Sequence, residues 1–90
     1  MLKNLEELIL LIRDRKKFSK ENSYTEKLLK DNSLATKKIR EEIEELIESV
    51  ENNSNKIHET ADVIYHLLVY LEANDIKIEE VMSELNKRKK

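Results

Sequence analysis

The chain has 90 residues, of which 40% are charged and 39% hydrophobic, and it contains no Gly, Pro or Cys. This length predicts a single domain over residues 1–90, and the absence of Cys excludes disulfides and thiolate metal sites. The formal net charge of −2 gives no strong attraction to nucleic acid. No uncharged run reaches the roughly 18 residues of a membrane span. We therefore expect a cytoplasmic protein without nucleic-acid or membrane partners.

The predicted elements are all helical. A first amphipathic helix is expected over residues 2–15, because apolar residues recur at i, i+3, i+4 spacing. A basic, polar stretch runs from Arg13 to Asn22. Ser23 and Glu26 then form a capping box, which predicts the start of a short helix that ends near residue 31.

Three further helices are predicted in the second part of the chain. One covers residues 34–51, the next residues 56–72, and the asparagine-rich segment 52–55 is the clearest turn between them. Residues 61–71 are apolar almost all round, which indicates the most buried helix. The last helix has its apolar face at Ile78, Val81, Met82 and Leu85. The fold class is therefore an all-α bundle of four to five helices, and so small a chain often gains stability by oligomerising.

Two acidic pairs lie on the two helices that the turn joins. At about 100° per residue, Glu42 flanks the apolar stripe of the 34–51 helix, which centres near Ile39 and Val50, and Glu45 follows one turn later. Glu59 and Asp62 are also three residues apart, so their side chains are neighbours. Glu44 and Glu48, by contrast, point toward solvent.

The joined helices should run antiparallel, which brings the two acidic pairs face to face. Four carboxylates in one cleft repel each other, and Mg²⁺, which prefers oxygen ligands, resolves that repulsion. Acidic pairs on a charged helix are also commonly a solvated face. Asp62 stands inside an apolar run, where a carboxylate needs a partner. These residues alone leave both interpretations open, and His66 alone indicates a buried, hydrogen-bonded histidine rather than a ligand.

The spacing Glu41-Glu42-x-x-Glu45 followed by Glu59-x-x-Asp62 resembles the metal signature of the MazG-like, all-α nucleotide pyrophosphohydrolases. Further segments narrow this resemblance to the phosphoribosyl-ATP pyrophosphatase family. It covers about Leu5 to Arg88. Its segments are Ser23-Tyr24-Thr25, Lys27-Leu28-Leu29, Lys38-Ile39-x-Glu41-Glu42, Ala61 to Val69, and Val81 to Leu85.

The resemblance implies hydrolysis of phosphoribosyl-ATP to phosphoribosyl-AMP and pyrophosphate, the second step of histidine biosynthesis. It implies dependence on Mg²⁺, with Mn²⁺ as an alternative ion, and a homodimer of helical bundles. The implied metal ligands are Glu42, Glu45, Glu59 and Asp62. Glu41 is expected to orient the attacking water as a base, to support the ligands, or simply to be exposed. Phosphoribosyl-AMP cyclohydrolase, the next enzyme, is expected on a separate chain.

Several side chains are candidates for contacts with the nucleotide substrate. Lys38 shares the acidic side of its helix and is the first candidate for a phosphate contact. The second candidates lie in the basic stretch, at Arg13, Arg15 and Lys16. In the tripeptide 23–25, hydroxyl groups of Ser23 and Thr25 could bind ribose or phosphate, and Tyr24 could stack on a base. A helix cap with an aromatic core residue explains the same tripeptide equally well.

The chain departs from the family pattern where glycine is usual, since Asn22, Asn32 and Arg40 occupy those positions. Arg40 is the departure that could add a charge near the site.

Two other functions compete with this interpretation. A house-cleaning pyrophosphatase acting on free or non-standard nucleoside triphosphates would use the same metal site. A non-catalytic helical interaction module would also fit the amphipathic helices and high charge, but it gives no reason for Asp62 in an apolar run.

Overall fold

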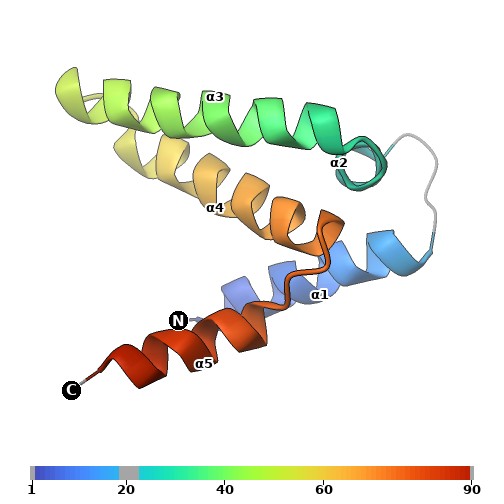
Figure 1. Cartoon of the computed structure of the whole chain (residues 1–90). Helices are drawn as coiled ribbons and strands as arrows, with labels where there is room; N and C mark the ends of the chain where they lie inside the picture. Colours follow the sequence, from blue (N-terminus) through green and yellow to red (C-terminus); the bar gives the residue numbers. More distant parts are fainter. Residues whose placement is uncertain (1, 19–22, 90) are drawn as a thin grey trace.

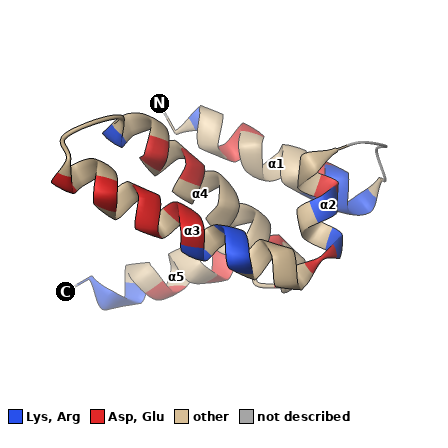
Figure 2. Cartoon of the chain, turned by 90° about the horizontal axis from the view of Figure 1, so that it is seen from above, with Lys and Arg blue, Asp and Glu red and all other residues tan. Residues whose placement is uncertain are grey.

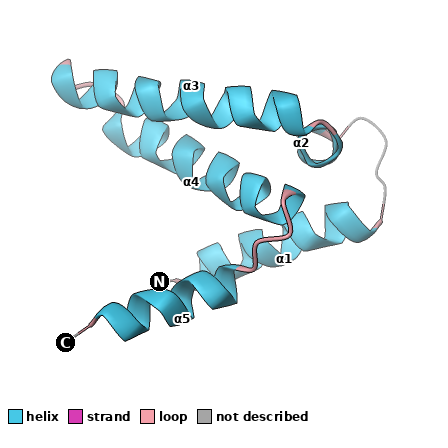
Figure 3. Ribbon diagram, in the orientation of Figure 1, coloured by secondary structure: helices cyan, strands magenta, loops and turns pink. Residues whose placement is uncertain are grey.

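The computed structural model describes residues 2–18 and 23–89, and within them the chain is five α-helices without a strand (Figures 1 and 3). This confirms the all-α prediction. The end of the predicted basic stretch, residues 19–22, lies outside the described residues, and Asn22 with it. The helices are α1 Lys3–Lys17, α2 Tyr24–Lys30, α3 Asn32–Glu51, α4 Lys56–Ala73 and α5 Ile78–Arg88.

Helix α1 continues two residues beyond its predicted end. Its last turn carries Arg15, Lys16 and Lys17, and cations there interact favourably with the negative end of the helix dipole. The basic residues from 13 to 17 are thus helical rather than part of a connecting stretch. None of the helices in the described part of the chain is long and apolar enough to cross a lipid bilayer.

Helices α3 and α4 form an antiparallel hairpin across the predicted asparagine turn (Figure 1). Asn53 adopts a left-handed conformation with φ of 52°. The Ser54 amide donates to the Ser49 carbonyl at 2.9 Å, and the Asn53 amide donates to the Val50 carbonyl at 3.2 Å. These two bonds are the Schellman motif that commonly ends a helix at glycine. Asparagine performs that role in this glycine-free chain.

Helix α4 is the central element, as the sequence predicts, because it packs against α1, α2 and α3. Its buried side chains Leu68 and Val69 meet Ile12 of α1, Leu28 of α2 and Ala35 of α3 in a single core cluster. However, Ile64 and Leu67 of α4 are exposed in this chain, so the helix is not covered all round.

The face that α3 turns inward differs from the predicted one. Its most buried positions are Ala35 and Ser49, and the half-buried positions in the same row are Ile39, Glu42 and Leu46. Val50, expected at the centre of the apolar stripe, is exposed, and so are Ile43 and Ile47. The inward face is thus rotated toward Glu42, because α4 packs on that side of the helix.

Candidate metal centre

Three of the predicted ligands meet between α3 and α4. Oxygen atoms of Glu42, Glu45 and Glu59 all lie within 4.8 Å of one another. Figure 2 shows the acidic positions of α3 running beside those in the first half of α4. The hairpin explains this arrangement, because Glu42 lies on the inward face of α3 and Glu59 lies in the first turn of α4.

Two of these carboxylates stand in an environment that disfavours negative charge. One oxygen of Glu42 and one of Glu59 are buried without a hydrogen-bond partner in the structure. Burial, and after it the negative charge of Glu45, raises the pKa of Glu42. Burial, followed by the nearby Glu45 carboxyl group, also raises the pKa of Glu59.

The donor set fits a small, hard divalent cation. Unpartnered carboxylate oxygens are costly when buried, and a cation would satisfy them while offsetting their repulsion. Oxygens on opposite sides of Mg²⁺ are about 4 Å apart, since each bond is about 2.0–2.1 Å. The separation of up to 4.8 Å is therefore within reach of small side-chain movements.

Asp62, the fourth predicted ligand, is half-buried one turn after Glu59. Its Oδ2 atom lies 3.4 Å from Nε2 of His58. His58, Glu59 and Asp62 form a second group whose donor atoms lie within 4.8 Å of one another. Glu59 belongs to both groups, which makes it the centre of a continuous row of donors.

Lys38 and Glu41 are paired with each other beside this row. The Lys38 Nζ atom lies 3.3 Å from Oε2 of Glu41, and this contact raises the pKa of Lys38. Tyr24 and Glu42 add weaker electrostatic effects on Lys38, so the ammonium group faces the acidic side of α3. Its proposed contact with phosphate and the role of Glu41 as a base stay predictions.

The tripeptide 23–25 docks α2 onto α4. The Ser23 hydroxyl accepts a hydrogen bond from the Glu26 amide at 3.2 Å, which confirms it as the N-cap. The Tyr24 hydroxyl lies 3.0 Å from Nε2 of His66, and the Thr25 hydroxyl shares a hydrogen bond with Tyr65. All three hydroxyl groups have partners within the chain, so their role as substrate contacts stays a prediction beside an established structural one.

His66 connects the tripeptide to the carboxylates. It is only 8% exposed, which agrees with a hydrogen-bonded core histidine. Its Nδ1 atom lies 2.8 Å from the carbonyl oxygen of Asp62 and must donate, because a carbonyl only accepts. In the neutral ring Nε2 then accepts a hydrogen bond from the Tyr24 hydroxyl group. Helix α2 is thereby bonded to the backbone of a predicted metal ligand.

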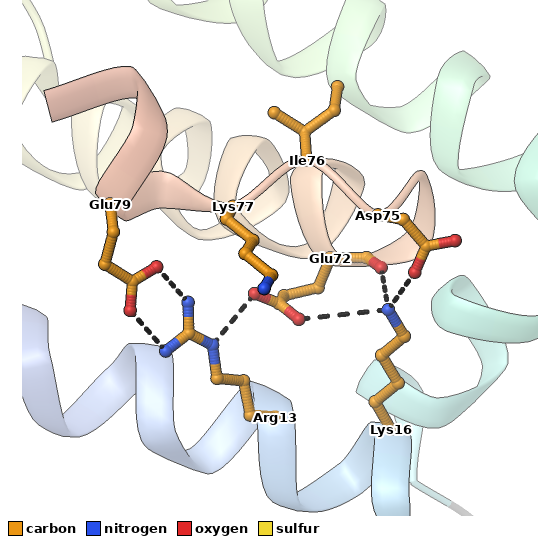
Figure 4. A pocket seen from close by; sticks show the side chains of 7 residues that line it. All are labelled: Arg13, Lys16, Glu72, Asp75, Ile76, Lys77 and Glu79. Atoms are coloured by element: carbon orange, nitrogen blue, oxygen red, sulfur yellow. Dashed lines mark hydrogen bonds and ion pairs between the residues drawn. The ribbon is translucent and has the colours of Figure 1, made fainter. Parts of the chain in front are cut away.

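The other basic candidates lie elsewhere in the chain. Arg13 donates to Glu72 at 3.0 Å and to both carboxylate oxygens of Glu79 at 2.8 and 2.6 Å (Figure 4). Lys16 donates to the Glu72 carbonyl at 2.6 Å and to Asp75 at 2.7 Å.

Glu72 is ten residues after Asp62 on α4, about 15 Å along the helix axis. Arg15 pairs with its neighbour Asp14 at 3.0 Å. The structure thus brings Lys38 to the carboxylates, but it does not bring Arg13, Arg15 or Lys16 to them within one chain.

Arg40 adds no charge to the metal centre. It is exposed and stands two residues from Glu42, about 200° around the helix. Asn32 begins α3 without a positive φ angle. Neither position therefore needs the conformational freedom of glycine in this chain.

His58 is the donor that the sequence pattern did not single out. The signal was present, because His58 and Asp62 are four residues apart and therefore neighbours on one helix face.

A hollow of about 180 Å³ adjoins the row of donors and is lined by Glu45, Glu48, Ser49, Asn52, Ser54, Asn55 and Glu59.

The fold and these donors define a class, the all-helical proteins in which two paired helices bring several carboxylates together. Comparison with known proteins makes this specific. Residues 5–89 match the family described as phosphoribosyl-ATP pyrophosphohydrolase. The chain belongs to this family.

Comparison with individual proteins gives the same family. The phosphoribosyl-ATP pyrophosphatase of Clostridium novyi is 43% identical over 89 residues, which cover 96% of this chain and 81% of the relative. That of Halobacterium salinarum is 40% identical, over 94% of this chain and 96% of the relative. The histidine biosynthesis bifunctional protein HisIE of Pyrococcus furiosus is 45% identical, and this chain spans 42% of its length.

Proposed function

We propose that this chain is a cytoplasmic, Mg²⁺-dependent enzyme that hydrolyses phosphoribosyl-ATP to phosphoribosyl-AMP and pyrophosphate, the second step of histidine biosynthesis. Family membership supports the reaction. The observation that carries the metal dependence is the pair of buried, unpartnered oxygens of Glu42 and Glu59 beside Glu45. Mn²⁺ is the alternative ion, since it also accepts carboxylate ligands.

Each group has a defined task in the reaction. Glu42, Glu45, Glu59 and Asp62 hold the cation, which when bound supplies a positive charge that polarises phosphate oxygens and lowers the pKa of water. Water attacks the α-phosphorus, the bond from that phosphorus to the bridging oxygen breaks, and pyrophosphate leaves. Glu41 accepts the proton of the attacking water, and Lys38 contacts the phosphates and balances the charge of the leaving group.

A homodimer completes the site. Ile43, Ile47 and Val50 form an exposed apolar row on α3, and Ile64 and Leu67 are exposed on the neighbouring helix α4. Apolar patches of this kind commonly mark protein interfaces. The hollow at the carboxylates, about 180 Å³, is also smaller than the roughly 300–1,000 Å³ of ligand pockets. A second subunit packed on these faces would enlarge the nucleotide pocket with its own residues.

Purified chain should release pyrophosphate from phosphoribosyl-ATP with Mg²⁺, and the release should stop with EDTA and return on adding Mg²⁺. Resolving the products by chromatography distinguishes phosphoribosyl-AMP from other cleavage products. A panel of deoxynucleoside triphosphates tests the house-cleaning alternative. Faster turnover of that panel than of phosphoribosyl-ATP would contradict the proposed substrate, and no release from any nucleotide would favour a non-catalytic interaction module.

A further inference from the structure

His58 extends the row of carboxylates with a nitrogen donor. Its Nε2 atom lies 3.4 Å from Oδ2 of Asp62, and its donor atom is within 4.8 Å of those of both Glu59 and Asp62. The side chain is 72% exposed, so a solvated metal ion can reach the imidazole. The buried oxygen of Glu59 has no hydrogen-bond partner in the structure, which leaves it available as a ligand beside His58.

We infer that His58 is a metal ligand that adds a nitrogen donor to the proposed carboxylate centre and so favours nitrogen-binding transition ions, such as Zn²⁺, relative to Mg²⁺. The inference rests on the proposed function in one respect, namely that these carboxylates hold a divalent cation. Imidazole is a good ligand for transition ions, whereas Mg²⁺ selects oxygen. One nitrogen donor among several oxygen donors therefore raises the affinity for transition ions relative to Mg²⁺, while the carboxylates still bind both kinds of ion.

The position of His58 on α4 allows it to bind the same ion as Asp62. Residues four apart on a helix face the same side, so the imidazole and the Asp62 carboxylate can bind one ion without any change in the backbone. The alternative is a surface ion pair between a protonated imidazole and Asp62, which on exposed side chains contributes little. The two alternatives differ in how the imidazole nitrogens respond to metal.

Nitrogen NMR of the histidine side chains provides the test, because the chain has two histidines and the second is an internal control. Both ring nitrogens of His66 are already hydrogen-bonded, to Tyr24 and to the Asp62 carbonyl. Titration of the metal-free chain with Zn²⁺ should shift the NMR signal of a ring nitrogen of His58 and leave those of His66 unchanged. Calorimetry on the same samples gives the affinities for Zn²⁺ and Mg²⁺.

In His58→Asn the affinity for Zn²⁺ should fall by roughly tenfold or more, because losing even an outer partner of a metal ligand costs about 10–100-fold. The ratio of Zn²⁺ to Mg²⁺ affinity should fall with it. Asp62→Asn is the second variant, since it keeps the imidazole but replaces the neighbouring carboxylate with a neutral amide. Zn²⁺ binding to His58 should weaken there too.

Three results would overturn the inference. Calorimetric binding of Zn²⁺ without any change at His58 would show that the carboxylates act without it. Undiminished Zn²⁺ binding in Asp62→Asn would show an isolated surface imidazole. In both cases Mg²⁺ binding by the unmodified chain, measured by the same calorimetry, would keep the proposed function standing without His58. Failure of the unmodified chain to bind either ion would overturn the metal centre and the inference together.

Discussion

Glu42 and Glu59 hold negative charge in a place where burial opposes it. Their pKa values are raised above the ordinary 4.5. A carboxyl group with a raised pKa in the folded state binds protons more tightly there than in the unfolded state. Stability therefore falls as pH rises through about 4.5 and toward the higher folded value. The free energy of unfolding of the metal-free chain is thus reduced at neutral pH by its own ligand set.

Glu42→Gln should accordingly raise the melting temperature of the metal-free chain at pH 7. The amide keeps the shape of the side chain but removes the charge from its buried site. The gain in melting temperature should disappear below about pH 4, where the Glu42 carboxyl group is protonated and carries no more charge than the amide. Thermal melts followed by circular dichroism, with EDTA present, measure this directly. A lower melting temperature than the unmodified chain at pH 7 would contradict the unfavourable burial of this charge.

Tyr24→Phe should lower the free energy of unfolding by about 1–2 kcal/mol, because it leaves the buried Nε2 atom of His66 without a partner. Urea denaturation provides the measurement. Thr25→Val, which removes the hydroxyl that bonds Tyr65, is the companion variant. An unchanged midpoint in both would show that these bonds do not hold α2 to α4. If the Tyr24 and Thr25 hydroxyl groups instead contact the substrate, the two variants should raise KM for phosphoribosyl-ATP.

Among individual residues, the sequence predicted which carboxylates gather, but not where the basic side chains lie or most of what they contact. Ser23 as an N-cap and His66 as a buried histidine follow from local pattern alone. The pairing of Lys38 with Glu41 and the engagement of Arg13 by Glu72 and Glu79 do not. These contacts depend on rotamers and on helix packing, which spacing along one helix does not determine.

Among the described residues, backbone strain is found at helix ends, where Asn53, Asn55 and Asp75 have positive φ angles. Asn53→Ala should destabilise the protein by about 1 kcal/mol, because a Cβ is unfavourable in this conformation and alanine lacks the polar side chain that eases it. Asn53→Gly should retain or raise the melting temperature. Equal melting temperatures for the alanine and glycine variants would contradict the cost of the left-handed turn.

Helix α5 has no fully buried residue, so the ion pair of Glu79 with Arg13 of α1 adds to the packing of its partly buried Ile78 against the core. The Arg13 guanidinium lowers the pKa of Glu79 to about 2. The stabilisation from a lowered carboxyl pKa is present above its unfolded value and is lost as pH falls toward the folded one. Glu79→Gln should therefore speed amide hydrogen exchange in α5 at pH 7, with Glu84→Gln as an exposed control in the same helix. Equal exchange in both variants would contradict this attachment.

The positions of the five helices could be predicted to within two residues at most ends, because apolar periodicity and turn residues are local signals. The face that each helix buries could not be predicted from these local signals. The exposed row at Ile43, Ile47 and Val50 has the same periodicity as a core-facing row. Periodicity shows that a face is apolar and does not show whether the same chain or another one covers it.

For the whole molecule, the exposed rows of α3 and α4 predict association. Ile47→Glu should convert the chain to a monomer in analytical ultracentrifugation, because a buried, unpaired charge at an interface is strongly unfavourable. Ile47 is 47% exposed in one chain, so the substitution should leave the helical circular dichroism intact. A dimer of unchanged affinity would place the interface elsewhere, for example along the apolar groove between α1 and α5.

In the proposed reaction, the carboxylates of α3 and α4 hold the cation that supports hydrolysis of phosphoribosyl-ATP. The most direct test is the rate of pyrophosphate release at saturating Mg²⁺ by Glu45→Gln and Asp62→Asn, with Glu44→Gln as an exposed control on the same helix. The first two should lose about 100-fold or more with unchanged circular dichroism, and the control should match the unmodified chain. Near-normal rates in both Glu45→Gln and Asp62→Asn would contradict a catalytic metal centre at these carboxylates.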